Sequence, residues 1–324
     1  MTQLPGLLKF TPKYRTVRWG GRRIAAFKNT EPTGDHIGES WELSALPDML
    51  TPVTEGPLKG ATIPQLMEKY GRELVGEQLL YRYGCEFPLL IKFIDAEDDL
   101  SIQVHPDDIL SHGHGKTELW YIIDAAPGST IYSGLNRTLT PNALRKHIDD
   151  HSLTDVLAIH YPMAGDVFYL PAGRIHSIGG GNLVLEIQQS SDITYRIWDF
   201  DRRDKDGCLR ELHVDKAIPA IDLNQTDYGL AHPQILRGYE TMVKQTPYFS
   251  VTAMLVDGEM TVPVSALDSF RIFIAVEGEG TLRASDGTEM SIRCGETVMA
   301  PASTTDVRVT SGAGPLKLVT VFIA

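Results

Sequence analysis

The chain has 324 residues, of which 42% are hydrophobic and 22% charged, and its formal net charge is −12 at pH 7. This length and composition predict a folded protein with two domains. The acidic balance argues against a general binder of nucleic acid or of anionic membranes, because both need a basic face. A small anionic ligand stays compatible with it, since a few local cations are enough to bind one phosphate.

The three cysteines, Cys85, Cys208 and Cys294, are far apart, and no C-x-x-C pair occurs. The sequence therefore predicts neither a disulfide framework nor a thiolate metal site. The first ten residues lack the apolar core of a signal peptide, and no stretch of about 18 apolar residues could span a membrane. We expect a cytoplasmic monomer or homodimer that binds neither membranes nor nucleic acid.

The N-terminal half combines strands with helices. Residues 38–44 alternate two kinds of side chain, which predicts a half-exposed edge strand, although its carboxylates and tryptophan could also line a pocket. Residues 62–83 begin with a capping box and an early proline, and apolar side chains follow at helical spacing. Further short helices are predicted from Thr140 and over residues 212–222, before a linker at 223–240.

Two adjoining strands are predicted before residue 106. The first is apolar except for Lys92, whose ammonium group must reach an anion or a polar cavity. The second covers residues 100–105 and places Ser101, Gln103 and His105 on one face. A polar face is usually exposed to solvent, but in a barrel it can point into the cavity.

Two later strands also carry polar side chains. Glu118 begins an apolar strand that follows a loop-like segment, residues 106–117. Residues 183–189 form another predicted strand, with Glu186 on its polar face, and this strand leads toward Arg196. We therefore expect several ionisable groups at the ends or on the inner faces of strands.

The segment Gly165–His176 combines a short apolar strand, a turn set by Pro171 and Gly173, and a terminal histidine. Such a turn fixes the position of His176, as a metal ligand requires. The spacing G-x5-P-x-G-x2-H resembles the second motif of the cupins, small β-barrels that hold a metal inside. A β-turn that carries a surface histidine is the alternative interpretation.

The G-x5-P frame returns at Gly295–Pro301, where Asp306 occupies the place of His176. The strand before it repeats the apolar pattern of the Glu118 strand, with Arg271 in place of the glutamate. The repeat predicts a mainly β fold of two cupin-type jelly-roll barrels, with a few helices packed on the first. Residues 1–235 would form the catalytic, metal-binding domain, and residues 236–324 a degenerate barrel without metal ligands. An unrelated β-domain is the alternative for the second part.

The first barrel supplies two imidazoles, one carboxylate and one amide as potential metal ligands: His105, His176, Glu118 and Gln103. This set suits Zn²⁺, and also Fe²⁺, Mn²⁺ or Co²⁺. A rival assignment uses His112 and His114, which with Glu118 match the usual first cupin motif H-x-H-x3-E. We prefer His105, because glycine-separated histidines in a loop are poorly preorganised for metal binding.

Six sequence blocks between about residues 10 and 220 together resemble the mannose-6-phosphate isomerases (phosphomannose isomerases) of the short bacterial form. In that family, a zinc ion in a cupin barrel organises the interconversion of mannose 6-phosphate and fructose 6-phosphate. The resemblance implies a phosphorylated hexose as substrate and one Zn²⁺ per chain, with Gln103, His105, Glu118 and His176 as ligands. The blocks are Lys-Tyr-Arg-Thr-Val-Arg-Trp-Gly20, Ile-Gly-Glu-Ser-Trp-Glu-Leu-Ser44, Leu-Ser-Ile-Gln-Val-His-Pro-Asp107, Gly-Lys-Thr-Glu-Leu-Trp120, Pro-Ala-Gly-Arg-Ile-His176 and Ile-Thr-Tyr-Arg-Ile-Trp-Asp199.

Aldose–ketose isomerisation moves a proton between C1 and C2 through an enediol, and it needs a base and a stabiliser of oxygen charge. By family resemblance, Glu186 is a candidate base, and Arg196 stabilises the enediolate or binds phosphate. Lys116 could transfer protons or pair with a sugar oxygen, while Lys92 and Ser101 are candidates for binding the phosphate. The identity of the base stays open among the metal histidines, Lys116 and Glu186.

Two other functions are compatible with the same ligands. An iron-dependent cupin oxygenase also uses two histidines and one carboxylate. A non-catalytic sugar-binding cupin would keep the pocket without the chemistry. The additional Gln103 and the cationic residues favour the isomerase.

Overall fold

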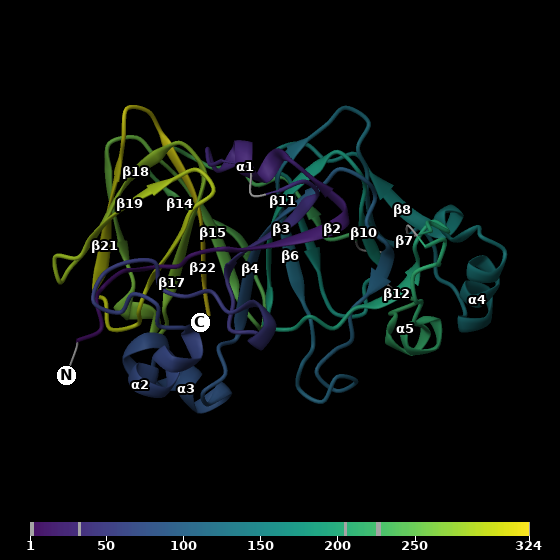
Figure 1. Cartoon of the computed structure of the whole chain (residues 1–324), viewed down its shortest axis with the longest axis horizontal. Helices are drawn as coiled ribbons and strands as arrows, with labels where there is room; N and C mark the ends of the chain where they lie inside the picture. Colours follow the sequence, from purple (N-terminus) through teal and green to yellow (C-terminus); the bar gives the residue numbers. More distant parts are fainter. Residues whose placement is uncertain (1–2, 32–33, 204–205, 225–227, 324) are drawn as a thin grey trace.

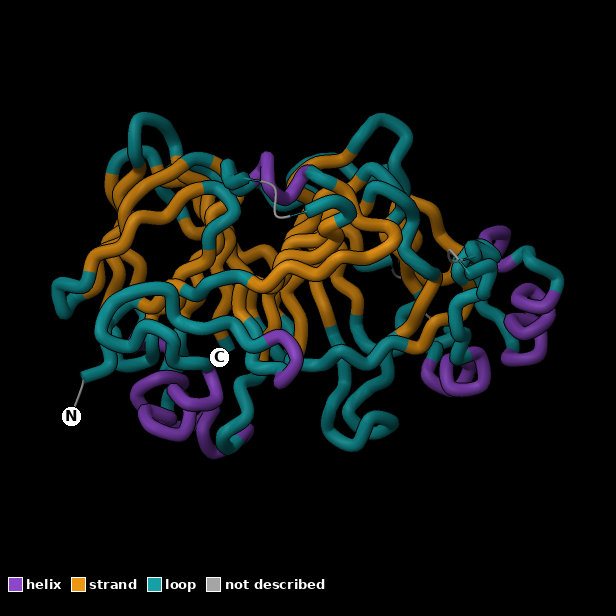
Figure 2. Tube along the Cα trace, viewed as in Figure 1, coloured by secondary structure: helices purple, strands orange, loops and turns teal. Residues whose placement is uncertain are grey.

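The computed structural model describes residues 3–31, 34–203, 206–224 and 228–323, and these form two antiparallel β-barrels that lie side by side (Figure 1). Figure 2 shows the strands of both barrels with short helices at their periphery. This arrangement confirms the predicted mainly β class with two cupin-type barrels. Among the described residues, no helix is long and apolar enough to cross a membrane.

The first barrel consists of a seven-stranded sheet and a five-stranded sheet. The seven-stranded sheet has the order β13-β9-β6-β11-β4-β2-β3, and β3 also pairs with β4. The five-stranded sheet has the order β12-β5-β10-β7-β8. The strands are β2 (Lys13–Gly21), β3 (Ile37–Leu43), β4 (Leu89–Ala96), β5 (Ile102–Val104), β6 (Glu118–Ala125), β7 (Ile131–Leu135), β8 (Leu157–His160), β9 (Val167–Leu170), β10 (His176–Ile178), β11 (Asn182–Gln189), β12 (Tyr195–Trp198) and β13 (Leu230–Ala231).

The second barrel pairs a six-stranded sheet, β1-β20-β17-β22-β15-β14, with a four-stranded sheet, β16-β21-β18-β19. Its first strand comes from the start of the described chain, so that Leu8 pairs with Met299. The strands are β1 (Leu8–Lys9), β14 (Glu240–Gln245), β15 (Ser250–Val256), β16 (Glu259–Pro263), β17 (Arg271–Glu277), β18 (Glu279–Ala284), β19 (Glu289–Arg293), β20 (Thr297–Ala300), β21 (Asp306–Ser311) and β22 (Leu316–Phe322).

The strand register supports the internal duplication. Glu118 at the start of β6 pairs with Leu170, the residue before Pro171. In the second barrel, Arg271 at the start of β17 pairs with Ala300, the residue before Pro301. Arg271 therefore occupies the position of Glu118, as the sequence pattern predicted.

The helices are α1 (Arg23–Phe27), α2 (Ile63–Val75), α3 (Glu77–Tyr83), α4 (Pro141–Asp149) and α5 (Val214–Ala220). α4 and α5 pack on the five-stranded sheet of the first barrel, where Leu144 and Ala217 join its core. α2 and α3 differ from the expectation because they lie beside the second barrel (Figure 1) and share a core with both barrels. The backbone N–H of Ala302 donates to the carbonyl of Leu74 at 3.0 Å, which ties the end of α2 to the second barrel.

A second difference concerns β3, which was expected to be a half-exposed edge strand. It lies between β4 and β2, and all its residues except Glu39 are buried. A third difference is in the predicted linker at 223–240, where β13 pairs with β9. The division of the chain at residue 235 remains a prediction.

The apolar pattern of β4 follows from burial on both sides of the sheet. Ile91 and Phe93 belong to a hydrophobic core shared by the two barrels. Ile94 belongs to a core inside the first barrel. Because side chains alternate along a strand, Lys92 points to the same side as Ile94, into the barrel. An apolar strand can therefore accommodate Lys92 only because polar groups inside the barrel interact with its ammonium group.

Candidate metal centre and active site

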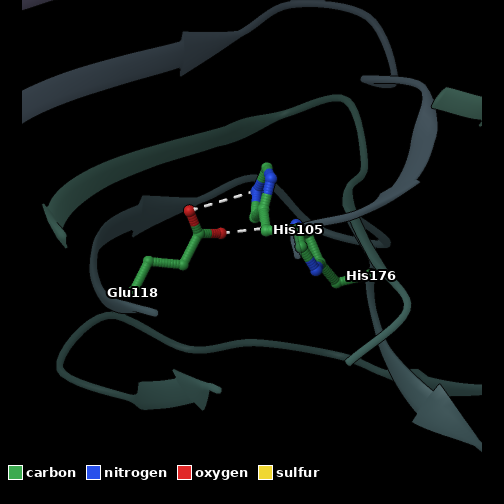
Figure 3. A group of neighbouring side chains, drawn as sticks. All are labelled: His105, Glu118 and His176. Atoms are coloured by element: carbon green, nitrogen blue, oxygen red, sulfur yellow. Dashed lines mark ion pairs between the residues drawn. The ribbon is translucent and has the colours of Figure 1, made fainter. Parts of the chain in front are cut away.

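Three buried side chains converge inside the first barrel: His105 directly after β5, and Glu118 and His176 as the first residues of β6 and β10 (Figure 3). Nε2 of His105 lies 3.4 Å from Oε2 of Glu118, and Nε2 of His176 lies 3.3 Å from Oε1 of the same carboxylate. One potential ligand atom from each residue lies within 4.8 Å of the other two. The sequence had placed these groups at the ends of strands, and the barrel brings them together.

Backbone carbonyls orient both imidazoles. Nδ1 of His105 lies 2.8 Å from the carbonyl oxygen of Ile193, and Nδ1 of His176 lies 2.8 Å from that of Arg174. A carbonyl can only accept, so each Nδ1 carries the proton and each Nε2 presents a lone pair toward Glu118. A hydrogen bond from Nδ1 to a backbone carbonyl is the usual way in which a protein fixes a histidine that binds metal through Nε2.

The three groups fit a divalent cation. Nε2 of His105 and Oε1 of Glu118 are buried and have no hydrogen-bond partner among the described residues. Burial lowers the pKa of His105, and it lowers the pKa of His176 to about 3, so both imidazoles are neutral ligands at pH 7. Burial alone would raise the pKa of Glu118, but the ammonium group of Lys116 outweighs it and holds that pKa well below its usual value. Neutral imidazoles and an ionised carboxylate are the forms that bind metal.

Gln103 stands next to this group in the sheet. It pairs with His176 across β10 and β5, and with Arg196 across β5 and β12. Its amide nitrogen, Nε2, lies 3.4 Å from Nε2 of His176. Because the two ends of a glutamine amide can exchange places by a flip, its oxygen can face the same point. The hydroxyl of Ser101 donates to this amide oxygen at 3.4 Å.

The rival histidines lie elsewhere. His112 and His114 are exposed in the segment between β5 and β6, and His112 has a positive φ of 56°. Among the described residues, the group able to hold a metal contains His105 instead. His105 directly follows β5 (Ile102–Val104), so the predicted strand over residues 100–105 is shorter in the structure, and the choice of His105 as a metal ligand stays a prediction.

A row of charged groups lies on the opposite sheet. Glu186 on β11 pairs with Lys92 on β4 and with Trp120 on β6. Nζ of Lys92 lies 3.5 Å from Oε2 of Glu186, and the indole N–H of Trp120 donates to Oε1 at 3.3 Å. Nζ of Lys92 also lies 4.3 Å from the centre of the Trp41 ring, which is a cation–π contact. The apolar strand thus tolerates Lys92 because it faces an anion and an aromatic ring.

Lys116 connects this row to the metal group. Its Nζ lies 2.9 Å from Oε2 of Glu118 and 3.8 Å from Oε1 of Glu186, and only 4% of the residue is exposed. Burial lowers the pKa of Lys116, but Glu118 and Glu186 outweigh it and raise that pKa above its usual value. Burial and the charge of Glu118 raise the pKa of Glu186 to about 7, against the opposing effect of Lys116 and Lys92.

A cavity of about 230 Å³ opens over these groups. Its wall includes every predicted site residue outside the metal triad: Lys92, Ser101, Gln103, Lys116, Glu186 and Arg196. The triad lies behind Gln103 and Lys116, which contact His176 and Glu118. A polar pocket with an acid–base pair beside a metal group can bind a small hydrophilic substrate and move its protons.

The structure adds cavity residues that the sequence reasoning missed. Arg15 and Trp19 on β2, and Arg210 after β12, line the same cavity. Arg15 and Trp19 lie in a block that resembles the family, but residues 10–20 were expected to be irregular, whereas they include most of β2 (Lys13–Gly21). Arg210 lies outside any helix or strand, so no pattern marked it.

Comparisons with known proteins agree with this geometry. The family model for the catalytic domain of type I phosphomannose isomerase matches residues 7–128, and that for the cupin domain of mannose-6-phosphate isomerase matches residues 239–323. Mannose-6-phosphate isomerase ManA of Bacillus subtilis is 37% identical over 282 residues, which cover 85% of this chain and 87% of that protein. The mannose-6-phosphate isomerase of Streptococcus mutans is 35% identical over 293 residues, which cover 87% of this chain and 88% of that protein.

Solved structures extend the likeness to nearly the whole chain. The crystal structure of the mannose 6-phosphate isomerase from Bacillus subtilis has a TM-score of 0.84 and 31% identity, covering 98% of this chain and 99% of that chain. A putative mannosephosphate isomerase from Archaeoglobus fulgidus has a TM-score of 0.80 at 22% identity over the full length of both chains, which shows the shared fold. With its duplicated barrel, its buried ligand group and these relatives, the chain belongs to the type I phosphomannose isomerase family.

Proposed function

We propose that the chain interconverts mannose 6-phosphate and fructose 6-phosphate by proton transfer through an enediol. The observation that carries this function is the convergence of His105, Glu118 and His176 beside the buried Lys116–Glu186 pair at the inner end of one polar cavity. An aldose–ketose isomerase needs a proton-transferring group and a stabiliser of negative oxygen next to each other in a confined site.

We propose Zn²⁺ as the metal, one per chain, with Gln103 as the fourth ligand beside the triad. Two imidazoles, a carboxylate and an amide oxygen without thiolate suit this ion. When bound, such a cation polarises the oxygens of the sugar. The surrounding residues carry the remaining work of binding, orientation and proton transfer.

The proton-transfer roles follow from the ion pairs. Glu186 is the preferred base, because its pKa of about 7 allows it both to accept and to return a proton near neutral pH. Lys116 stays charged, since its pKa is raised, so its proposed role is to stabilise a negative oxygen and to donate a proton. Arg196, on the strand next to Gln103, is proposed to bind the enediolate or the phosphate.

Other expectations from the sequence remain predictions. Lys92 and Ser101 line the cavity as phosphate candidates. The cytoplasmic location, the monomeric or homodimeric state and the absence of nucleic-acid binding also remain predictions.

A coupled assay for fructose 6-phosphate, together with metal analysis, tests the function. The wild type should turn over mannose 6-phosphate and lose activity on metal removal. His176→Ala should lose both metal and activity, because it removes one imidazole of the triad. His114→Ala is the matched control, since this histidine is exposed and belongs to the rival motif. Full turnover by metal-stripped protein, or by His176→Ala, would contradict the proposal.

The alternative functions make different predictions in the same samples. A cupin oxygenase requires iron and consumes oxygen. A sugar-binding cupin would keep its affinity for the sugar phosphate in His176→Ala and show no turnover in the wild type. The family relatives and the Lys116–Glu186 pair favour the isomerase.

A further inference from the structure

The loop between β5 and β6 carries Lys116 and joins two residues of the metal triad. It covers residues 106–117 and ends directly before Glu118. The backbone N–H of Lys116 donates to the carbonyl oxygen of Pro106 at 3.1 Å, so the two ends of the loop meet. The path of this backbone therefore decides where the Lys116 ammonium group stands between Glu118 and Glu186.

Polar contacts centred on Asp108 hold this loop. The next two residues, Ile109 and Leu110, are exposed to solvent, so apolar packing contributes little to fixing the loop. Oδ1 of Asp108 accepts a hydrogen bond from the backbone N–H of Gly115 at 3.0 Å, and the charge of the carboxylate strengthens this bond. Asp108 therefore joins the start of the loop to the residue that directly precedes Lys116.

The contact between Asp108 and Gly115 leaves little room for another arrangement. A Cβ atom at position 115 would lie 2.5 Å from Oδ1 of Asp108 and 2.7 Å from its backbone nitrogen. Both separations are shorter than a non-bonded contact allows, so a side chain here would push the carboxylate and the loop backbone apart. Glycine at this position thus lets the carboxylate contact the backbone directly next to Lys116.

Tyr248 reaches Asp108 from the second barrel. It lies in the turn between β14 and β15, and its hydroxyl donates to Oδ2 of Asp108 at 3.0 Å. The turn is itself well fixed, because the hydroxyl oxygen of Thr246 accepts from the backbone N–H groups of Tyr248 and Phe249 at 3.1 and 2.9 Å. Phe249 is buried in the core that the two barrels share. The phenol of Tyr248 is therefore a firmly held donor to Asp108.

The first barrel supplies another support for the same carboxylate. Nε2 of Gln189 donates to Oδ1 of Asp108 at 3.3 Å, and Oε1 of Gln189 accepts from the backbone N–H of Thr117 at 2.8 Å. Gln189 is the last residue of β11, the strand that also carries Glu186. Asp108 thus connects the loop of Lys116 with the strand of the proposed base on one side and with Tyr248 on the other.

We propose that Tyr248 and Asp108 are positioning residues through which the second barrel holds Lys116 in place for catalysis. This inference rests on the proposed function, in which Lys116 stabilises a negative oxygen and donates a proton. The ammonium group lies 3.8 Å from Glu186, so a shift of about 1 Å would separate the pair, and misplacement by about this distance can lower a rate about 100-fold. The second barrel thus contributes to the reaction although the metal triad lies in the first.

Hydrogen exchange of the metal-loaded protein tests the positioning without relying on turnover. Tyr248→Phe removes only the hydroxyl, so the amides of residues 109–116 should exchange about 5- to 10-fold faster, while those of β15 should be unchanged. Asp108→Ala should cause a larger increase, because it removes the acceptor of all these side-chain contacts. Asp108→Asn should restore protection, since its amide oxygen can accept from Gly115 and its nitrogen can donate to the Tyr248 oxygen.

Tyr239→Phe is the matched control, because this tyrosine directly precedes β14 and its side chain is exposed. It should leave both the exchange rates and kcat unchanged. Faster exchange in the β14–β15 turn and in β15, without a change in residues 109–116, would show that Tyr248 stabilises only its own barrel and would overturn the proposal. Unchanged exchange of residues 109–116 in both Tyr248→Phe and Asp108→Ala would overturn it as well.

Kinetics separate the positioning of Lys116 from metal binding and from the isomerase function. In an active wild type at saturating Zn²⁺, Tyr248→Phe should lower kcat about 10-fold, keep KM for mannose 6-phosphate within about 2-fold and leave the metal content unchanged. Asp108→Asn should retain more of kcat than Asp108→Ala, because it keeps both contacts.

Two kinetic outcomes would overturn the inference while the isomerase function stands. One is an unchanged kcat in both Tyr248→Phe and Asp108→Ala. The other is a loss of kcat that follows a loss of metal, because the contacts would then support the metal ligands rather than Lys116. If the wild type produces no fructose 6-phosphate, the isomerase proposal fails, and the exchange rates of residues 109–116 still decide whether Tyr248 holds the loop.

Discussion

Replacing Lys116 by methionine probes the ion-pair network of the active site. The residue is 4% exposed, and its ammonium group lies 2.9 Å from Glu118 and 3.8 Å from Glu186. Breaking a buried pair by removing one partner costs about 3–5 kcal/mol, because the remaining charge is left uncompensated. We expect about 3 kcal/mol, the lower end of that range. The reason is that Glu186, with a pKa already raised to about 7, can take up a proton once Lys116 is gone.

The assay is urea unfolding of the metal-free protein, followed by the same measurement at saturating Zn²⁺. A bound cation beside Glu118 replaces part of the missing charge, so the loss should be smaller in the presence of metal. Lys146→Met is the matched control, since this lysine pairs with Asp150 on the exposed face of α4, and its removal should scarcely change stability.

A double mutant sharpens the test. Lys116→Met combined with Glu186→Gln removes one of the two carboxylates that Lys116 contacts, so its loss of stability should be smaller than the sum of the single losses. Equal losses in Lys116→Met and Lys146→Met would refute the reasoning. Strict additivity in the double mutant would refute the coupling between Lys116 and Glu186.

Three further predictions concern other parts of the molecule. Gln103→Leu should lower metal affinity about 10- to 100-fold while the triad still binds, as measured by competition with a chelator, whereas unchanged affinity would exclude Gln103 as a ligand. Tyr248, which donates to Asp108 at 3.0 Å, has a pKa raised to about 12 by burial and this carboxylate. Because the folded state holds the phenol proton more tightly, Tyr248 contributes its full share to the free energy of unfolding below pH 10 and loses it between pH 10 and 12. Tyr248→Phe should therefore show a smaller fall in the free energy of unfolding over that interval than the wild type. Arg271→Met, in the second barrel, should destabilise the protein, because Arg271 is 3% exposed and pairs with Glu240 at 2.9 Å. It should leave kcat of the folded enzyme unchanged. A loss of turnover would contradict a purely structural role for Arg271.

The sequence predicted the metal group because its signals are local. A histidine after a Pro–Gly turn, and a histidine on the polar face of a strand, can each be recognised without the fold. Their convergence depends on barrel closure, which only the duplicated motif and the family resemblance indicated. The structure then supplied what local patterns lack, namely the carbonyls of Ile193 and Arg174 that orient the two imidazoles.

Other features could not be predicted for physical reasons. The polar face of β3 resembles a solvent-exposed face in sequence, because polar residues line a cavity inside a barrel just as they cover a surface exposed to water. The apolar face of α2 shows that the helix is covered, but helical periodicity does not tell which barrel covers it. Arg210 lies in irregular chain, where position depends on tertiary contacts that leave no periodic signal.

The pairing of β1 with β20 has a consequence for how the molecule is assembled during synthesis. Leu8 leaves the ribosome long before Met299, its neighbour in the sheet. During translation, β1 must therefore remain unpaired while the metal-binding barrel is synthesised, because the other five strands of its sheet all follow that barrel in the chain. Variants that slow translation near β20 should prolong the time for which β1 is unpaired and increase aggregation, without altering any residue of the active site.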